Sequence, residues 1–270
     1  MERTWLITGA AAGLGREWTE AALERGDRVA ATARGGLERF APLAEQHGDR
    51  VLPLELDVTD RAQAFAVVRE AADTFGALDV VVNNAGYGHF GMVEELSEAD
   101  IRAQLETNFF GTLWVTQAAL AIMRTQGSGH ILQNTSEGGI IAYPGIGAYH
   151  ASKWAVEGLT ESLAQEVGSF GIKVTLVEPG PYDTGFGGTH NLSDPLPAYD
   201  GVRASGAQDW DFGDPRATRD AILRVVDADA PPRRIFLGRS SLPQVEATYA
   251  ARLATWREWE PVSLAAMGAV

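Results

Sequence analysis

Short apolar segments alternate with longer helical patterns along the chain, and this alternation constrains the fold more than any other feature. Strands are expected at Thr4–Thr8, Val29–Ala33, Val51–Leu56, Leu78–Val82, His130–Asn134, Ile172–Val177 and Arg234–Leu237. Helices are expected through Ala21–Leu23, and at Leu37–Gln46, Asp60–Phe75, Glu98–Arg124, Ala148–Val167, Arg216–Val226 and Pro243–Glu258. Such alternation predicts right-handed βαβ units and a parallel sheet. We therefore expect an α/β fold, a doubly wound Rossmann-type three-layer sandwich.

The domain organisation is expected to be simple. No linker and no internal repeat divides the 270 residues, so we expect a single dinucleotide-binding catalytic domain over 1–270. One irregular region, 181–214, is rich in Gly, Pro, Asp and Ser. A loop of that length inside a compact domain is typical of an active-site lid or of disorder, and we expect it to be a substrate lid with helices following it.

Composition excludes several classes of function. The formal net charge of -14 argues against a nucleic-acid or anionic-membrane surface, because both need a basic face. The absence of Cys removes disulfides, thiolate metal sites and a Cys nucleophile, and no metal site is expected. The sequence has neither a signal-peptide pattern at its start nor an apolar run long enough for a membrane helix, so the expected location is cytoplasmic.

A glycine-rich loop follows the first expected strand and opens a helix. In Thr8–Gly15 the candidate cofactor contacts are Gly9, Ala12, Gly13, Leu14 and Gly15. Glycines let the turn close and let the backbone approach a pyrophosphate, while the helix N-terminus offers free N–H groups. The spacing is G-x-x-x-G-x-G rather than G-x-G-x-x-G, and taken alone the loop could be only a structural turn.

The end of the second expected strand bears on the choice of dinucleotide. A site for NAD needs an acidic residue there to accept hydrogen bonds from the ribose hydroxyls. The segment 30–36 carries Arg34 and no acid, and a guanidinium suits a 2′-phosphate. We expect NADP(H) to be preferred, with NAD(H) possible. The alternative is that Arg34 is a solvated surface residue.

A tyrosine and a lysine share one face of the helix expected at Ala148–Val167. Tyr149 and Lys153 are four residues apart, and Lys153 is one of only two lysines in the chain. An adjacent cation is expected to lower the pKa of the phenol toward neutral pH, which suits a general acid or base. Ser136 follows the strand expected at His130–Asn134, where its hydroxyl could hydrogen-bond a substrate carbonyl.

These motifs together resemble the short-chain dehydrogenase/reductase family, in the subgroup with Thr-Gly-x-x-x-Gly-x-Gly and Tyr-x-x-x-Lys. The resemblance runs over nearly the whole chain, and its motifs occur in order at Thr8–Gly15, Asp57-Val58, Asn83–Gly86, Asn108, Ser136, Tyr149 with Lys153, and Pro179-Gly180. It implies a homodimer or homotetramer, often built through the two long helices expected at Glu98–Arg124 and Ala148–Val167.

The resemblance implies catalytic roles for four residues. Tyr149 would be the general acid or base, and Lys153 would lower its pKa and bind the nicotinamide ribose. Ser136 would orient the carbonyl, and Asn108 would hold a water in a proton relay from Lys153. Asn108 could also be an ordinary helix residue.

The resemblance also implies further cofactor contacts. Asp57 would hydrogen-bond the adenine amino group, with Val58 against the ring, although Asp57 could instead cap a turn before the next helix. The other implied contacts are Asn84, Ala85 and Gly86 beside the adenine ribose and nicotinamide, Pro179 and Gly180 flanking the nicotinamide, and Thr184 at its carboxamide.

The substrate wall departs from the usual family pattern. Glu137 follows Ser136 where the family usually has a small or apolar residue; it could face solvent, or it could favour a cationic and disfavour an anionic substrate. His150 points to a different helix face from Tyr149 and is interpreted as a surface or interface residue, and Pro181 could stiffen the hinge of the lid. Candidate wall residues are Phe90, Ser136, Glu137, Tyr143, Tyr149 and Tyr182, with Tyr87, His89, Gly138–Pro144 (including Ile140 and Ile141), Trp210 and Phe212 nearby.

Three functions follow from these residues. The first is an NADP(H)-dependent ketoreductase or secondary-alcohol dehydrogenase acting on a small-molecule substrate that is largely apolar. The second uses the same scaffold for cyclisation, dehydration or epimerisation without net redox change, a possibility raised by the altered segment Asn134–Glu137. The third is a protein that binds the cofactor as a sensor without catalysis.

Overall fold

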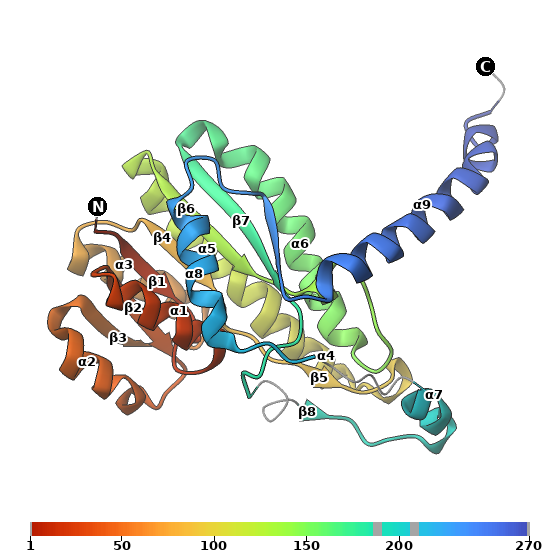
Figure 1. Ribbon diagram of the computed structural model, residues 1–270, viewed down its shortest axis with the longest axis horizontal. Helices are drawn as coiled ribbons and strands as arrows, with labels where there is room; N and C mark the ends of the chain where they lie inside the picture. Colours follow the sequence, from red (N-terminus) through yellow and green to blue (C-terminus); the bar gives the residue numbers. More distant parts are fainter. Residues whose placement is uncertain (1, 186–190, 206–210, 269–270) are drawn as a thin grey trace.

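Seven parallel strands form the centre of the protein. The computed structural model describes residues 2–185, 191–205 and 211–268. The strands are β1 (Thr4–Ile7), β2 (Arg28–Ala33), β3 (Val51–Glu55), β4 (Val80–Asn83), β6 (Gly129–Asn134), β7 (Ile172–Pro179) and β9 (Arg234–Leu237). Their order is β3-β2-β1-β4-β6-β7-β9, with every pairing parallel. The expected doubly wound α/β fold is confirmed (Figure 1).

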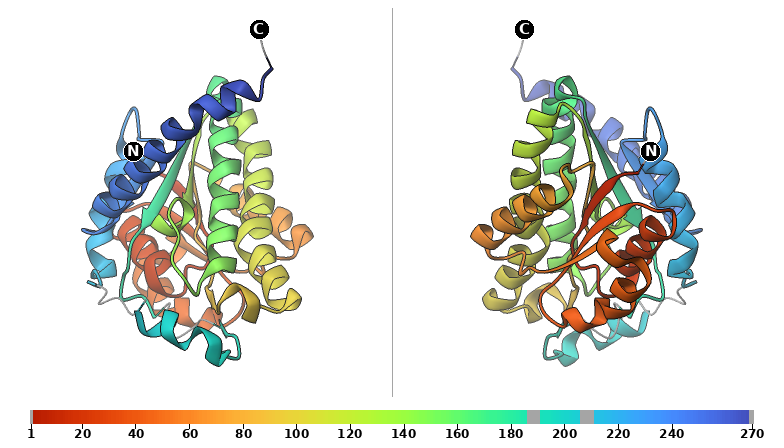
Figure 2. Two further views of the ribbon diagram at one scale, coloured as in Figure 1. Left: turned by 90° about the vertical axis from the view of Figure 1, so that its right-hand side faces the viewer. Right: turned by 90° about the vertical axis from the view of Figure 1, so that its left-hand side faces the viewer.

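Helices cover both faces of the sheet (Figure 2). One face carries α3 (Arg61–Phe75), α5 (Gly111–Gln126) and α6 (Gly147–Val167), and the other carries α1 (Gly13–Glu24), α2 (Ala41–His47) and α8 (Thr218–Asp227). The remaining helices are α4 (Glu98–Leu105), α7 (Asp200–Ser205) and α9 (Ser241–Ala265). Single-turn segments are η1 (Leu37–Phe40), η2 (Gly48–Arg50), η3 (Val93–Glu95), η4 (Glu106–Phe110), η5 (Glu137–Gly139), η6 (Gly168–Phe170), η8 (Pro197–Tyr199) and η9 (Pro215–Ala217).

Successive residues of each central strand serve opposite layers. Leu6 packs with the α3, α5 and α6 layer, whereas its neighbours Trp5 and Ile7 pack with the α1 and α8 layer. All three are fully buried. A strand covered on both faces needs apolar residues at every position, which explains the continuous apolar runs in the sequence.

Two expected helices are interrupted. The helical stretch expected at Glu98–Arg124 consists of α4, a π-helical turn at η4 and α5. The helix expected at Leu37–Gln46 is a 3-10 turn followed by α2, with Pro42 in the first turn of α2. Hydrophobic periodicity alone does not reveal such changes of helical type, because the apolar face continues across them.

The region expected to be an irregular lid contains regular elements. Within its described part, β8 (Asn191–Leu192) pairs with β5 (His89–Phe90), and η8 and α7 follow. The buried Glu95 carboxylate ties this segment down by accepting a 2.7 Å hydrogen bond from the Leu196 amide and pairing with Arg203. The segment 191–205 is therefore attached to β5 through β8 and to η3 through Glu95.

The last helix is longer than expected. α9 begins at Ser241 and reaches Ala265, and its distal half runs away from the body of the protein (Figure 1). Its proximal part packs through Val245 on Ile140 and Ile141, while Trp256 and Trp259 are 58% and 60% exposed. Among the described residues no helix combines the length and apolar character required to cross a bilayer.

Candidate active site

A large cavity opens at the carboxyl ends of the strands. The chain crosses from one half of the sheet to the other between β1 and β4, and this is where open α/β sheets form a ligand crevice. The cavity has a volume of about 1670 Å³. Pockets for one drug-sized ligand usually occupy ~300–1000 Å³, so this cavity has room for a long ligand and a second molecule.

The structure brings nearly all of the predicted site residues to this cavity. Its lining includes Gly9, Ala12, Gly13, Leu14, Arg34, Asp57, Val58, Asn84, Ala85, Gly86, Phe90, Ser136, Glu137, Tyr143, Tyr149, Lys153, Pro179, Gly180, Tyr182 and Thr184. Gly15 and Asn108 are buried behind the lining.

The glycine loop lies directly beneath the cavity. Gly9 and Gly13 have φ of 63° and 56°, in the left-handed region that favours glycine. A β-carbon at Gly9 would lie 3.0 Å from Cα of Ala85, and one at Gly13 would lie 3.2 Å from Cβ of Thr184. The loop therefore needs glycine both for its conformation and for its close packing.

Helix α1 begins with its backbone N–H groups uncapped. Its N-cap residue, Ala12, provides no side-chain acceptor, and no acidic residue occupies the first turn. The free N–H groups and the positive end of the helix dipole favour a phosphate at this position. The glycine loop and the start of α1 thus fit the pyrophosphate of a dinucleotide.

Asn84 fastens the glycine loop to the ends of two other strands. Its Nδ2 donates to the carbonyl oxygens of Thr8 at 2.9 Å and Gly9 at 3.2 Å, and its Oδ1 accepts from Asn134 Nδ2 at 2.8 Å. A β-carbon at Gly15 would collide with the Asn84 side chain and lie 2.6 Å from the Gly9 carbonyl oxygen. Gly15 therefore leaves the space that Asn84 needs.

Arg34 lies exposed at the rim of the cavity, beyond the end of β2. Within the described part of the chain, no carboxylate oxygen lies within the 4.0 Å ion-pair distance of its guanidinium. Its charge is thus free of an acidic partner there. Asp57 lines the same end of the cavity and also holds a turn, because its Oδ1 accepts from the Thr59 amide at 3.0 Å. Asp60, rather than Asp57, caps α3.

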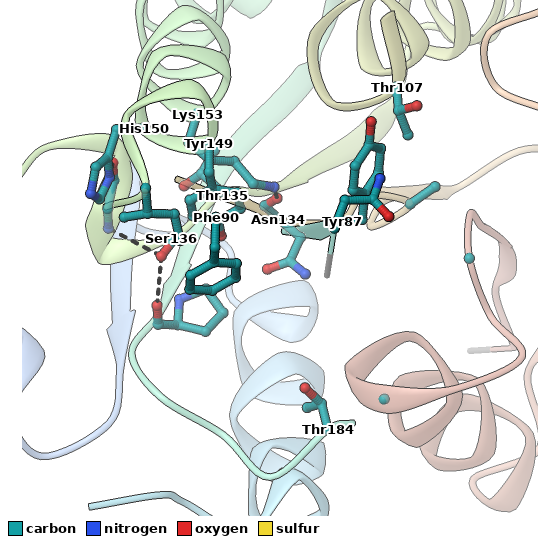
Figure 3. Close-up of a pocket in the computed structure, with 18 of the residues that line it drawn as sticks. Tyr87, Phe90, Thr107, Asn134, Thr135, Ser136, Tyr149, His150, Lys153 and Thr184 are labelled. Atoms are coloured by element: carbon teal, nitrogen blue, oxygen red, sulfur yellow. Dashed lines mark hydrogen bonds between the residues drawn. The ribbon is translucent and has the colours of Figure 1, made fainter. Parts of the chain in front are cut away.

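Ser136, Tyr149 and Lys153 meet at the other end of the cavity (Figure 3). Ser136 follows β6, and Tyr149 and Lys153 come from the first two turns of α6. The Tyr149 hydroxyl hydrogen-bonds Ser136. Ser136 Oγ also accepts from the Gly138 amide at 3.1 Å and donates to the Pro179 carbonyl oxygen at a long 3.3 Å.

Lys153 is held by the backbone rather than by an acid. Its Nζ donates to the Asn134 carbonyl oxygen at 2.8 Å and lies 5.7 Å from the centroid of the Tyr149 ring. A β-carbon at Gly86 would lie 3.0 Å from Asn108 Oδ1 and 3.7 Å from this Nζ, so glycine at this position mainly leaves space for the Asn108 side chain.

Asn108 occupies the π-helical turn η4 and supports the cavity wall. Its Nδ2 donates to the Tyr87 carbonyl oxygen and to Ser152 Oγ, each at 3.0 Å, and its Oδ1 accepts from the Tyr87 amide at 3.1 Å. π-Helical turns are frequent at functional sites. The side chain is engaged with protein groups, so a water relay through the Asn108 side chain remains a prediction.

The pKa values of Tyr149 and Lys153 differ from the expectation. Burial raises the pKa of Tyr149 to about 12, with the Glu137 charge adding to the increase and the Ser136 hydrogen bond opposing it. Burial also lowers the pKa of Lys153 to about 8, against the opposing charge of Glu157. The expected net lowering of the Tyr149 pKa is therefore not found in the protein alone, where burial has the largest influence.

Glu137 is buried instead of solvated. It is 3% exposed, and its Oε1 accepts a 3.0 Å hydrogen bond from the Tyr143 hydroxyl. The Tyr143 hydroxyl also lies 2.5 Å from Gln244 Oε1, in α9. The sequence left two possibilities open for the Glu137 side chain, one facing solvent and one acting on the substrate. The solvent-facing possibility is wrong.

His150 is also buried, which corrects its interpretation as a surface or interface residue. It is 6% exposed, its Nδ1 donates to the Gly138 carbonyl oxygen at 2.7 Å, and its Nε2 accepts from the Tyr143 amide at 2.9 Å. Burial lowers the His150 pKa, in keeping with a neutral ring. The ring fixes both ends of the loop between Gly138 and Tyr143.

Some residues expected to form the substrate wall do not line the cavity. Of the expected aromatic and loop residues, those that line the cavity are Tyr87, Phe90, Gly138, Tyr143, Pro144, Tyr182 and Phe212. His89 is 2% exposed, with its Nε2 2.9 Å from Ser193 Oγ, and Ile140 and Ile141 belong to a small core with Val245. His89, Ile140 and Ile141 are therefore interior residues rather than wall residues, and Trp210 lies outside the described residues.

A buried acidic cluster behind the site was not predicted. Glu157, one helical turn after Lys153, accepts a 2.6 Å hydrogen bond from Thr135 Oγ1 and pairs with Arg234 Nη2 at 2.6 Å. Glu178 is fully buried and also pairs with Arg234. Burial raises the pKa of Glu178 to about 8, and the Glu157 charge adds to the increase. The acids are adjacent only because β7, β9 and α6 pack together, so no local pattern could identify them.

Comparison with known proteins agrees with this geometry. The family profile described as short chain dehydrogenase matches residues 3–194. The oxidoreductase BOA17 of Botryotinia fuckeliana is 39% identical over 273 residues, covering 98% of this chain and 99% of that protein. The 3-ketodihydrosphingosine reductase of Bacteroides thetaiotaomicron is 33% identical over 276 residues, covering 92% and 96%.

Solved structures show the same architecture. A short-chain dehydrogenase from Streptomyces avermitilis has a TM-score of 0.90 and 38% identity, covering 97% of both chains. A Burkholderia cenocepacia short chain dehydrogenase in complex with NADP has a TM-score of 0.76 and 27% identity, covering 95% of this chain and 97% of that one. A Burkholderia phymatum homologue in complex with NAD has a TM-score of 0.78 and 25% identity, covering 91% and 92%.

Proposed function

This chain belongs to the short-chain dehydrogenase/reductase family, and on that premise we propose that it is an NADP(H)-dependent oxidoreductase that reduces a ketone or oxidises a secondary alcohol. The observation that carries the proposal is the shared cavity. Ser136, Tyr149 and Lys153 lie at one end, and the glycine loop with Arg34 lies at the other. The bound nicotinamide supplies or accepts the hydride.

In the reducing direction, Tyr149 donates its hydroxyl proton to the carbonyl oxygen. Ser136 donates a hydrogen bond to the same oxygen, since its 3.3 Å contact with the Pro179 carbonyl is weak and readily exchanged. Lys153 binds the ribose hydroxyls, and its charge stabilises the phenolate that remains. In the oxidising direction the phenolate takes the proton from the alcohol.

The cofactor is proposed to lie along the floor of the cavity. The N-terminus of α1 and the loop Gly9–Gly15 bind the pyrophosphate, and Arg34 binds the 2′-phosphate of NADP. Asp57, Val58 and Asn84–Gly86 border the adenine and ribose, while Pro179 and Gly180 border the nicotinamide. Thr184 lies against Gly13 and contacts the cofactor from the lid side. NAD(H) is the second choice, without the contact to Arg34.

The substrate is proposed to be a largely apolar carbonyl or alcohol. Phe90, Tyr143 and Tyr182 supply aromatic wall, and Glu137 disfavours an anionic group near the reacting carbon. The stretch 191–205 of the lid covers this side. One domain over 1–270, with 181–214 as its lid, remains the proposed organisation, and a cytoplasmic location remains a prediction.

We also propose self-association, as a homodimer or homotetramer. The exposed side chains of Trp154 on α6 and of Trp256 and Trp259 on α9 support it, because large aromatic groups gain most from burial at an interface. Light scattering coupled to size exclusion gives the mass directly, and a monomer at micromolar concentration contradicts the proposal.

The test of the activity is a panel of ketones and secondary alcohols with NADP(H) and NAD(H), read by nicotinamide absorbance. On the accepted substrate, Tyr149→Phe is expected to lower kcat by about 10²-fold or more with NADPH affinity within about twofold, as for loss of a general acid. Retained turnover in Tyr149→Phe overturns the mechanism. Product formed without net change in nicotinamide absorbance points instead to redox-neutral chemistry.

A further inference from the structure

A third residue of helix α6 lies on the face that carries the proposed catalytic pair. Glu157 follows Tyr149 and Lys153 at successive spacings of four, and residues so spaced stack along one helix face. It is buried, at 5% exposure, and is not among the described residues that line the cavity. A contribution of Glu157 to the reaction would therefore act through another residue.

Glu157 contacts the chain on both sides of Ser136. Thr135 Oγ1 donates a 2.6 Å hydrogen bond to Glu157 Oε1, and Thr135 is itself 3% exposed. A β-carbon at Gly139 would lie 2.9 Å from Glu157 Cγ, so the side chain also packs directly against the turn η5 that follows Ser136. The contact of Thr135 Oγ1 with the Val177 carbonyl oxygen is longer, at 3.3 Å, which makes Glu157 the principal acceptor.

The second oxygen of the Glu157 carboxyl group is engaged as well. Arg234 Nη2, from β9, donates to Oε2 at 2.6 Å, and the same guanidinium pairs with the buried Glu178. Glu178 directly precedes Pro179, whose carbonyl oxygen accepts from the Ser136 hydroxyl. Because both oxygens are bonded, the Glu157 side chain is held in one position.

Ser136 and Tyr149 come from different elements, the end of β6 and the first turn of α6 (Figure 3). In the proposed reaction both hydroxyls must reach one carbonyl oxygen, and hydrogen bonds between oxygen atoms span only ~2.5–3.0 Å. A misplacement of about 1 Å can lower a rate by about 10²-fold. The contact between Thr135 and Glu157 joins the end of β6 to α6 at the residue that precedes Ser136.

We propose that Glu157 is a positioning residue that, through Thr135, sets the distance between the Ser136 and Tyr149 hydroxyls. The inference rests on the proposed roles of these two hydroxyls in the reaction. It requires only the 2.6 Å hydrogen bond, whichever of the two groups supplies the proton, and so holds for either charge state of Glu157. The site then extends beyond the cavity to a buried support formed by β6, α6 and β9.

Thr135→Val tests the hydrogen bond by exchanging one hydroxyl for one methyl group. It is expected to lower kcat by about 10-fold to 10²-fold, while the KM for NADPH stays near the wild-type value because the cofactor contacts are untouched. Thr135→Ser keeps the hydroxyl and is expected to restore most of the kcat. An unchanged kcat in Thr135→Val, or an equal loss in Thr135→Ser, overturns the inference.

Thr160→Val is the matched control. Thr160 lies in the second half of α6, is fully buried, and donates its hydroxyl to the Val156 carbonyl oxygen at 2.7 Å. The substitution removes the same group from a buried site and leaves the hydrogen bond between Thr135 and Glu157 in place. Its kcat should match that of the wild type. A loss equal to that of Thr135→Val would assign the effect to any buried hydroxyl and overturns the inference.

A double-mutant cycle separates positioning from general support of the fold. If Thr135 acts through the Ser136 hydroxyl, Thr135→Val should lower kcat little further once Ser136→Ala has removed that hydroxyl. A merely structural role would lower kcat by the same factor in both backgrounds, and that result overturns the inference.

Glu157→Met tests the acceptor in the same way. It removes the carboxyl group and leaves Arg234 paired with Glu178. It should lower kcat as Thr135→Val does, and the two changes combined should lose no more than either alone, whereas a wild-type kcat overturns the inference. The Thr135 variants decide the question even if Glu157→Met does not fold, and urea unfolding of each variant shows whether it does.

Failure of the inference and failure of the proposed function give different results. Full turnover in Ser136→Ala or in Tyr149→Phe overturns the proposed function itself. Loss of turnover in both, with independent effects of Thr135→Val and Ser136→Ala, overturns only the positioning role of Glu157.

Discussion

The Lys153 ammonium donates a 2.8 Å hydrogen bond to the carbonyl oxygen of Asn134, the last residue of β6. The same Asn134 hydrogen-bonds Asn84 through its side chain, and Asn84 holds the glycine loop. The proposed catalytic cation and the proposed pyrophosphate site are therefore joined by a short chain of hydrogen bonds across three strand ends.

Replacing Lys153 with Met is expected to lower kcat by about 10²-fold or more and to raise the KM for NADPH, because a cation beside the phenolate and the ribose is lost. The chain's only other lysine provides the control. Lys173 donates to the Ala228 carbonyl oxygen at 2.9 Å, on β7 away from the cavity. Steady-state kinetics of Lys173→Met should match the wild type, and equal losses in both variants would assign the effect to stability alone.

Arg34→Ala is expected to raise the KM for NADPH by about tenfold or more, since hydrogen bonds to charged groups contribute ~1.5–3 kcal/mol, while the KM for NADH changes little. Arg69→Ala removes another exposed arginine, from α3, and serves as control. An unchanged ratio of the two kcat/KM values in Arg34→Ala refutes the contact with the 2′-phosphate.

Gly15→Ala is expected to destabilise the fold by about 1–3 kcal/mol, as typical of overpacking, and to weaken cofactor binding. The new methyl group would displace Asn84 from the glycine loop. Gly158, inside α6, has open space around it, so Gly158→Ala should be neutral or raise stability by up to ~1 kcal/mol. Urea unfolding and NADPH fluorescence titration measure the two effects, and a fully stable Gly15→Ala would show that the loop can adapt.

Glu178 is expected to make stability depend on pH. Its pKa is about 8 in the folded protein against an ordinary value of 4.5, so the folded state binds the proton more tightly. Stability from this group is present below pH 4.5 and is lost as pH rises toward about 8, because there the unfolded state binds fewer protons.

The measurement is urea unfolding between these two pH values for wild type and Glu178→Gln, with Glu166→Gln as the control on the solvent side of α6. Glu178→Gln should flatten the dependence and Glu166→Gln should not. An equal slope in all three proteins contradicts the assignment to Glu178.

Most of the fold could be predicted from the sequence because strands buried on both faces leave continuous apolar runs, such as Leu78–Val82. Residues that line the cavity could be predicted where they belong to a short sequence motif. Tyr149 and Lys153, four residues apart on one helix face, are an example. Glu137 and His150 could not be placed, because their burial depends on the path of the loop that carries Tyr143 and on α9, whose Gln244 lies 101 residues after Tyr143. The π-helical turn at Asn108 was equally hidden, since the apolar pattern passes through it unchanged.

The contacts of the site also set an order for its formation during synthesis. Asn84 bonds Thr8, 76 residues earlier, and Asn134, 50 residues later, while Tyr143 meets Gln244, 101 residues further on. Pairings so distant in the chain form slowly, and each needs both partners to have been synthesised. The cavity wall beside Ser136 is therefore complete only after α9 has been synthesised and has packed on the protein. Recovery of activity on refolding reports the packing of α9.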